Sequence, residues 1–79
     1  RPNPFNPATV LTFSLLERSR TVLTIYDILG RKAATLHDGV LGPGEHTIVW
    51  DARGFPSGVY FFTLKAGKYM ETKKMTLVK

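Results

Sequence analysis

The chain has 79 residues, 43% hydrophobic and 22% charged, which suits one small domain with a modest core and leaves little room for a deep active-site cleft. It has no cysteine, which excludes disulfides, and no apolar run long enough to form a transmembrane helix. The formal net charge is +5, and the last fifteen residues include Lys65, Lys68, Lys73, Lys74 and Lys79. We interpret these lysines as solvent-facing protection of an apolar hairpin, and we expect no nucleic-acid partner because the neighbouring aromatic residues have the spacing of a strand that packs into a core.

The first seven residues predict an extended lead-in. Pro2, Pro4 and Pro7 alternate with other residues, and each restricts the residue before it to extended geometry, so the segment cannot be helical. We expect Phe5 to anchor this lead-in against the rest of the domain. Because position 1 is Arg rather than Met, we also expect the sequence to be part of a longer protein.

Four segments then alternate apolar and polar residues as strands do: Ala8–Leu15, Thr21–Ile28, Lys32–His37 and Glu45–Trp50. The segments between them predict a charged turn, a tight turn and two loops: Glu17–Arg20, Asp27–Arg31, Asp38–Gly44 and Asp51–Gly58. We expect Gly30 to have a positive φ and Asp51 to cap its loop through the side chain. The alternation places Leu23 and Ile25 in the core and Thr24 on the solvent side.

The last 22 residues, Gly58–Lys79, predict a β-hairpin with its turn at Ala66-Gly67. Its first strand is apolar on both faces, with Tyr60, Phe62 and Leu64 at period two. A strand of this kind promotes aggregation when it lies at the edge of a sheet. We therefore expect it inside a sheet, paired on both sides.

Together these segments predict an all-β fold, an immunoglobulin-like antiparallel β-sandwich of six to seven short strands. No segment has a convincing helical period. We expect residues 1–79 to form a single domain, in which residues 8–79 make the sandwich. Phe13, Trp50, Tyr60 and Phe62 are expected to supply most of the core.

No constellation in the sequence predicts catalysis. His37 and His46 are too few for a zinc site without cysteine, and His46 is in phase with core residues. Asp27, Asp38 and Asp51 border turns but lack the spacing of a calcium loop. We therefore expect no enzyme activity, no metal and no cofactor.

Five short motifs in order carry a family resemblance. Residues 2–7 resemble the family opening "YPNPFNP", except that Arg1 replaces its usual aromatic residue. Residues 26–31 resemble "YDLLGR", and residues 44–51 resemble "GTHTVRWD". Residues 57–61 resemble "SGVYFY", and residues 73–79 resemble "RKLVLLK" at a C-terminus. Together these motifs resemble the type A C-terminal sorting domain of bacterial type IX secretion cargo. The immunoglobulin-like domain of the flagellar hook-capping protein shares much of this pattern.

The resemblance implies a non-catalytic secretion signal that directs a larger, upstream cargo protein through the periplasm and across the outer membrane. It implies as partners the type IX translocon and a sortase-like peptidase, which commonly removes such domains and attaches the cargo to the cell surface. The cargo would be secreted or held at the surface, with no membrane-spanning segment in the domain itself. Carried over by position, the partner-binding residues are Pro2, Asn3, Pro4, Gly58, Val59, Tyr60, Lys73, Lys74, Met75, Leu77, Val78 and Lys79.

Two other functions remain open from the sequence. A carbohydrate-binding accessory module would need exposed aromatic faces, so a shielded Trp50 would weaken that hypothesis. A structural immunoglobulin-like spacer would tolerate extension of the chain beyond Lys79, whereas a sorting signal would not.

Overall fold

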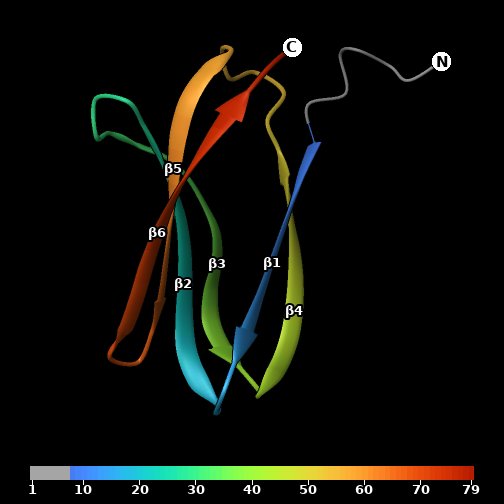
Figure 1. Ribbon diagram of the computed structural model, residues 1–79, viewed down its shortest axis with the longest axis vertical. Coiled ribbons are helices and arrows are strands. Elements are labelled where there is room, and N and C mark those ends of the chain that lie inside the picture. Colours follow the sequence, from blue (N-terminus) through green and yellow to red (C-terminus); the bar gives the residue numbers. More distant parts are fainter. Residues whose placement is uncertain (1–7) are drawn as a thin grey trace, which may run out of the picture.

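The computed structural model describes residues 8–79, and within them the chain forms six β-strands and no helix (Figure 1). The strands are β1 (Ala8–Leu15), β2 (Ser19–Asp27), β3 (Lys32–Leu41), β4 (Gly44–Asp51), β5 (Gly58–Ala66) and β6 (Tyr69–Leu77). Every pairing between them is antiparallel: β2–β3 and β5–β6 are hairpins of successive strands, whereas β1–β4 and β2–β5 pair strands that are not successive in the chain. The all-β prediction is confirmed.

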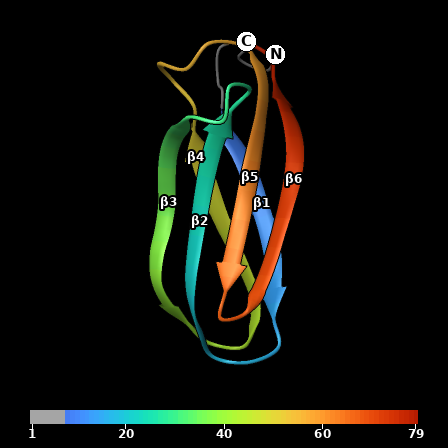
Figure 2. The same ribbon diagram turned by 90° about the vertical axis from the view of Figure 1, so that its left-hand side faces the viewer.

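The strands form two sheets that lie face to face as a small β-sandwich. One sheet has the two strands β1 and β4, and the other has four strands in the order β3-β2-β5-β6. Figure 2 shows the four-stranded sheet in front, with β1 and β4 behind it. Strand β5 lies between β2 and β6, which confirms that the most apolar strand is paired on both sides.

The core lies between the two sheets and is built by the period-two alternation of each strand. Leu23, Ile25 and Leu64 are fully buried where the inner face of the large sheet meets the small one. The four aromatic residues expected in the core, Phe13, Trp50, Tyr60 and Phe62, are all buried. Burying a large apolar side chain contributes about 1.5–3 kcal/mol, so this cluster is the main source of stability.

Strand β3 is longer than the sequence predicts. The predicted loop Asp38–Gly44 is wrong, because Asp38, Gly39, Val40 and Leu41 pair with β2 and continue the strand. Two register shifts in this pairing let β3 accommodate residues that break the alternation. The true connection to β4 is Gly42-Pro43, followed by Gly44 at a φ of 109°.

Two other boundaries also move. Strand β2 begins at Ser19, so the charged turn is shorter than predicted, and the hairpin turn lies at Gly67-Lys68 rather than at Ala66-Gly67. The expectation that Thr24 is exposed is wrong: its side chain points to the outer face, but only 6% of the residue is accessible. Its neighbours on the adjacent strands, Thr35 and Thr63, flank it on both sides.

The small sheet is too narrow to cover the whole inner face of the large one. Residues on that inner face of β2 and β5 are buried, whereas Lys73 on β6, paired with the buried Phe62, is exposed. A two-stranded layer facing four strands leaves the flanks of the larger sheet wet, which explains a lysine on the core side of an edge strand.

Two connections and the C-terminal end of the chain gather at one end of the sandwich, at the top of Figures 1 and 2. We call it the upper end; it consists of residues 27–32, 51–58 and 77–79. The lower end carries the hairpin turn at Gly67-Lys68 and the connections that follow β1 and β3. The antiparallel pairing brings together at the upper end segments that are distant in the sequence.

Candidate functional site

The structure pairs two of the three predicted partner-binding segments with each other. Gly58 lies opposite Leu77, Val59 opposite Thr76, and Tyr60 opposite Met75, so the first residues of β5 form the sheet with the last residues of β6. The third segment, Pro2, Asn3 and Pro4, lies outside the described residues, as does Phe5. The two described segments therefore form one structural unit, which closes the hairpin at the upper end.

Gly58 begins β5 with a φ of 153°. A Cβ placed on Gly58 would meet no heavy atom within 4 Å, so space does not dictate glycine here. The positive φ does, because residues with a Cβ rarely adopt it. Gly58 thus lets the chain turn from the β4–β5 loop into the sheet.

Tyr60 ties the start of β5 to the core and to the preceding loop. Its hydroxyl donates a hydrogen bond to the Pro56 carbonyl at 2.7 Å, and its ring packs edge-on against Trp50 with 5.2 Å between ring centroids. The Trp50 ring in turn packs against the Phe55 ring, with 5.4 Å between the ring centroids. This chain of aromatic contacts fixes the loop between β4 and β5 against the sandwich.

The last residues of the chain lie beside the same loop. The Lys79 amide donates a hydrogen bond to the Ser57 hydroxyl oxygen at 3.1 Å. Val78 nevertheless remains 77% exposed. The two residues that follow β6 are therefore held in place by the Lys79 backbone, while the side chains of Val78 and Lys79 are exposed.

The predicted partner-binding residues within residues 8–79 are buried, half-buried or exposed. Tyr60 and Leu77 are buried, and Gly58, Val59 and Met75 are half-buried. Lys73, Lys74, Val78 and Lys79 are exposed and accessible to another molecule. Lys73 and Lys74 point to opposite faces of the sheet because neighbouring residues on a strand alternate.

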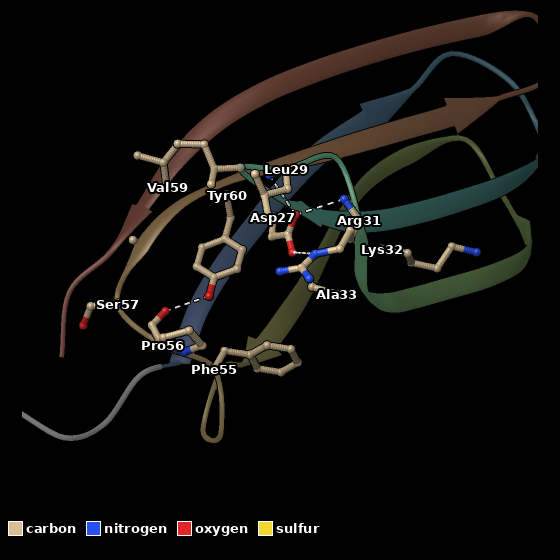
Figure 3. Close-up of a pocket in the computed structure, with 12 residues that line it drawn as sticks. Asp27, Leu29, Arg31, Lys32, Ala33, Phe55, Pro56, Ser57, Val59 and Tyr60 are labelled. Atoms are coloured by element: carbon tan, nitrogen blue, oxygen red, sulfur yellow. Dashed lines mark hydrogen bonds and ion pairs between the residues drawn. The ribbon is translucent and has the colours of Figure 1, made fainter.

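An open depression of about 410 Å³ lies at the upper end between the β2–β3 turn and the β4–β5 loop (Figure 3). Its lining joins Asp27, Leu29 and Arg31 of the turn to Phe55 and Pro56 of the loop. A larger depression of about 860 Å³ lies at the lower end, and no predicted partner-binding residue lines it. Two of the resembling motifs, in contrast, meet at the upper one.

Asp27 organises the turn that forms one wall of the depression. Its carboxylate accepts hydrogen bonds from the backbone amides of Leu29 and Arg31, each at 2.9 Å, and from the Arg31 guanidinium at 2.8 Å. The bond from the Arg31 amide is the largest influence that lowers the pKa of Asp27, because it stabilises the charged form. Gly30 completes the turn at a φ of 81°, as predicted.

Asp51 caps the loop that forms the other wall, as the sequence predicts. It accepts bonds from the Arg53 amide at 3.2 Å and from the Arg53 guanidinium. The side-chain bond from Arg53 lowers the pKa of the Asp51 carboxyl. Both carboxylates are therefore bonded to groups of their own turn or loop, which is a structural role.

Neither histidine stands in a set of metal-ligating residues, since residues 8–79 contain no group of three or more histidine, aspartate or glutamate side chains close enough to hold an ion. His46 is half-buried and donates from Nε2 to the Gly42 carbonyl at 2.7 Å. The centroid of its ring lies 5.7 Å from that of Phe13, so it packs on the core as predicted.

Residues 8–79 also contain no helix that could cross a membrane.

Trp50 is only 1% exposed, and its indole Nε1 finds no hydrogen-bond partner within residues 8–79. A ring so enclosed cannot stack on a sugar, which weakens the carbohydrate-binding alternative. Its role is to fill the core.

Sequence reasoning missed the lining of the upper depression. Ile28 and Leu29 are 67% and 72% exposed at the tip of the β2–β3 turn, although the sequence places Ile28 at the end of a strand. An apolar pair between a turn-forming aspartate and a glycine was the available signal. It could not reveal that the β4–β5 loop would lie opposite, because that proximity arises from the pairing of β2 with β5.

Comparison with known families identifies the chain's similarity to a sorting domain. The model described as the secretion system C-terminal sorting domain matches residues 2–79, essentially the whole chain. Searches of curated proteins and of solved structures found no match.

Proposed function

The chain belongs to the secretion system C-terminal sorting domain family, and from this premise we propose how it is read during export. The domain is a non-catalytic signal of type IX secretion, and it directs a cargo protein to the cell surface or the medium. A signal of this kind interacts with the secretion machinery. Which residues make that contact is the subject of our proposal.

The contact surface in our proposal is the upper end together with the last residues of β6. The exposed side chains of Lys73, Lys74, Val78 and Lys79 touch the translocon. The buried or half-buried members of the site, Gly58, Val59, Tyr60, Met75 and Leu77, act by holding these side chains in one arrangement. The observation that carries this proposal is the pairing of β5 with β6, which makes two resembling motifs a single structural unit.

The remaining steps follow from the same premise. The cargo precedes residue 1, passes through the periplasm and crosses the outer membrane with residues 1–79 folded as one domain. Pro2, Asn3 and Pro4 join the domain to the cargo and contribute to recognition. A sortase-like peptidase then removes the domain and attaches the cargo to the surface.

A reporter fusion tests the proposal. Residues 1–79 are placed behind a periplasm-targeted reporter in a type IX-competent cell, and the reporter is measured in the periplasm, at the surface and in the medium. We expect export of the unaltered fusion. We expect retention in the periplasm when Val78→Asp and Lys79→Glu are combined, because both side chains are exposed and neither contributes to the core.

A matched control introduces the same kinds of substitution at the opposite end of the sandwich. Leu16→Asp with Arg18→Glu makes the same two kinds of change at exposed positions of the lower end. Export of the control but not of the upper-end variant supports the proposal. Periplasmic retention of the unaltered fusion would contradict the function itself, and equal export of both variants would contradict the assigned surface.

A further inference from the structure

The outer face of the four-stranded sheet carries two rows of side chains aligned across all four strands. The strand register places one row as Lys32, Tyr26, Phe61 and Lys74, and the next as Thr35, Thr24, Thr63 and Thr72. We call the surface that these eight residues form the outer face. No other strand within residues 8–79 lies over it, as Figure 2 shows in front view.

The first row contains two aromatic residues that do not belong to the core. Tyr26 and Phe61 lie opposite each other on the two central strands and point away from the small sheet, and both are half-buried. Both belong to motifs that carry the family resemblance. Within residues 8–79 their apolar surface is shielded by neighbours on the same sheet and by no other strand, so a partner can still cover it.

The lysines at the two ends of the row have no opposite charge to satisfy them. Within residues 8–79 the three ion pairs join arginines to aspartates, and none includes a lysine. Asp38 is the aspartate on this side of the sheet, and Arg20 already binds it. Lys65 on β5 adds a third positive charge two residues beyond Thr63. The outer face is therefore positively charged around an apolar centre.

The dimensions suit a brief contact between proteins. Neighbouring strands lie about 4.8 Å apart, so the backbones of Lys32 and Lys74 are roughly 14 Å apart, and the two rows are separated by about 7 Å. A face of four strands, each about 30 Å long, projects under roughly 600 Å². Each partner in a stable interface contributes about 800 Å², so this face alone supports a transient contact.

We propose that the outer face docks an acidic protein surface of the secretion machinery, with carboxylates near Lys32 and Lys74 and apolar side chains over Tyr26 and Phe61. This inference rests on the proposed function and extends its contact surface: Lys32 lies at the upper end and Lys74 is already assigned to the translocon contact, whereas Tyr26 and Phe61 lie on the outer face alone. An apolar centre with a charged rim is the usual anatomy of a protein interface. A glycan fits less well, because Thr24 is buried and the Thr63 and Thr72 hydroxyls lie 3.2 Å apart, bonded to each other.

The test reverses the charge of two lysines on this side of the sheet that are not among the side chains already assigned to the translocon contact. Lys32→Glu with Lys65→Glu is introduced into the reporter fusion, next to a control with the same change in net charge at the lower end, Arg18→Glu with Lys68→Glu. All four positions are exposed, so circular dichroism and the thermal midpoint should match the unaltered fusion. We expect the outer-face variant to lose export on the order of tenfold, with accumulation in the periplasm, while the control is exported normally.

Each outcome decides something. Normal export of the outer-face variant overturns the docking surface and leaves the secretion signal intact. Failure of the unaltered fusion overturns the proposed function, and the docking surface with it. Equal loss in both variants shows an effect of net charge and overturns the assignment to this face. Retardation of the unaltered fusion, but not of the outer-face variant, in a gel containing polygalacturonate would identify an anionic glycan as the ligand instead of a protein.

Discussion

At the scale of single residues, the predicted site contains two kinds of side chain that the sequence does not separate. Tyr60 and Leu77 are buried, whereas the neighbouring Val78 is open to solvent. A loss of export on changing a buried residue reports the stability of the domain, and a loss on changing an exposed one reports contact. The two can be distinguished only by measuring stability beside export.

Tyr60 offers a direct measurement of its structural role. We expect Tyr60→Phe to lower the free energy of unfolding by about 1 kcal/mol, because the Pro56 carbonyl loses its hydrogen-bond donor. Tyr60→Ala should cost about 3–5 kcal/mol, because it also removes the ring that packs on Trp50. Urea unfolding followed by tryptophan fluorescence measures both. The half-exposed Tyr69 is the control, and a Tyr69→Phe change as large as that of Tyr60→Phe would contradict the assignment.

Leu77 and Val78 form a matched pair of neighbours. We expect Leu77→Ala to lower the free energy of unfolding by about 2–5 kcal/mol, because the side chain lies in the core. Val78→Ala should change it by less than about 0.5 kcal/mol. Chemical denaturation of the two variants checks this, and equal effects would show that the alternation at the end of β6 is assigned wrongly.

The Asp27 carboxylate gives the domain a defined dependence on acid. Its pKa is lower in the folded state, so its contribution to stability is fully present above the unfolded pKa of about 3.9 and is lost as pH falls through the folded pKa. We expect Asp27→Asn to flatten the fall in the thermal midpoint below pH 4. The carboxyl carbon shift of Asp27, followed by NMR titration, locates the folded pKa, and a value at or above 3.9 would contradict the turn geometry.

At the scale of the elements, regular alternation was enough to predict most strands. Strand β1 has the predicted bounds, because Leu11, Phe13 and Leu15 alternate without interruption. The predicted third strand ended too early, at His37, because Gly39 and the register shifts in the β2–β3 pairing break the alternation that marks a strand. The hydrogen bonds from β2 extend it instead, and a sequence read one segment at a time does not contain that pairing. The prediction that Thr24 is exposed was wrong for a similar reason, because the residues that cover it belong to neighbouring strands.

At the scale of the whole molecule, the sandwich brings parts of three of the five resembling motifs, those at residues 26–31, 57–61 and 73–79, to one end. The β2–β3 turn, the β4–β5 loop and the last residues of β6 meet there because each pair of neighbouring strands is antiparallel. The sequence identified these motifs separately but gave no sign that two of them would enclose a depression. Their common location is therefore a product of topology, and it supports the proposal that the machinery reads a folded surface rather than a linear peptide.

Extension of the chain beyond Lys79 distinguishes a sorting signal from a structural spacer. The Lys79 amide is bonded to Ser57 while the Val78 side chain faces solvent, so a flexible Gly-Ser tail can leave this end without disturbing the core. We expect the tail to leave the thermal midpoint of the reporter fusion unchanged and to reduce export, because it obstructs the upper end. An equally long Gly-Ser insertion between Gly67 and Lys68, in the turn at the lower end, is the control and should preserve export. If the tailed and unaltered fusions are exported equally, the end of β6 is not a surface that the translocon reads.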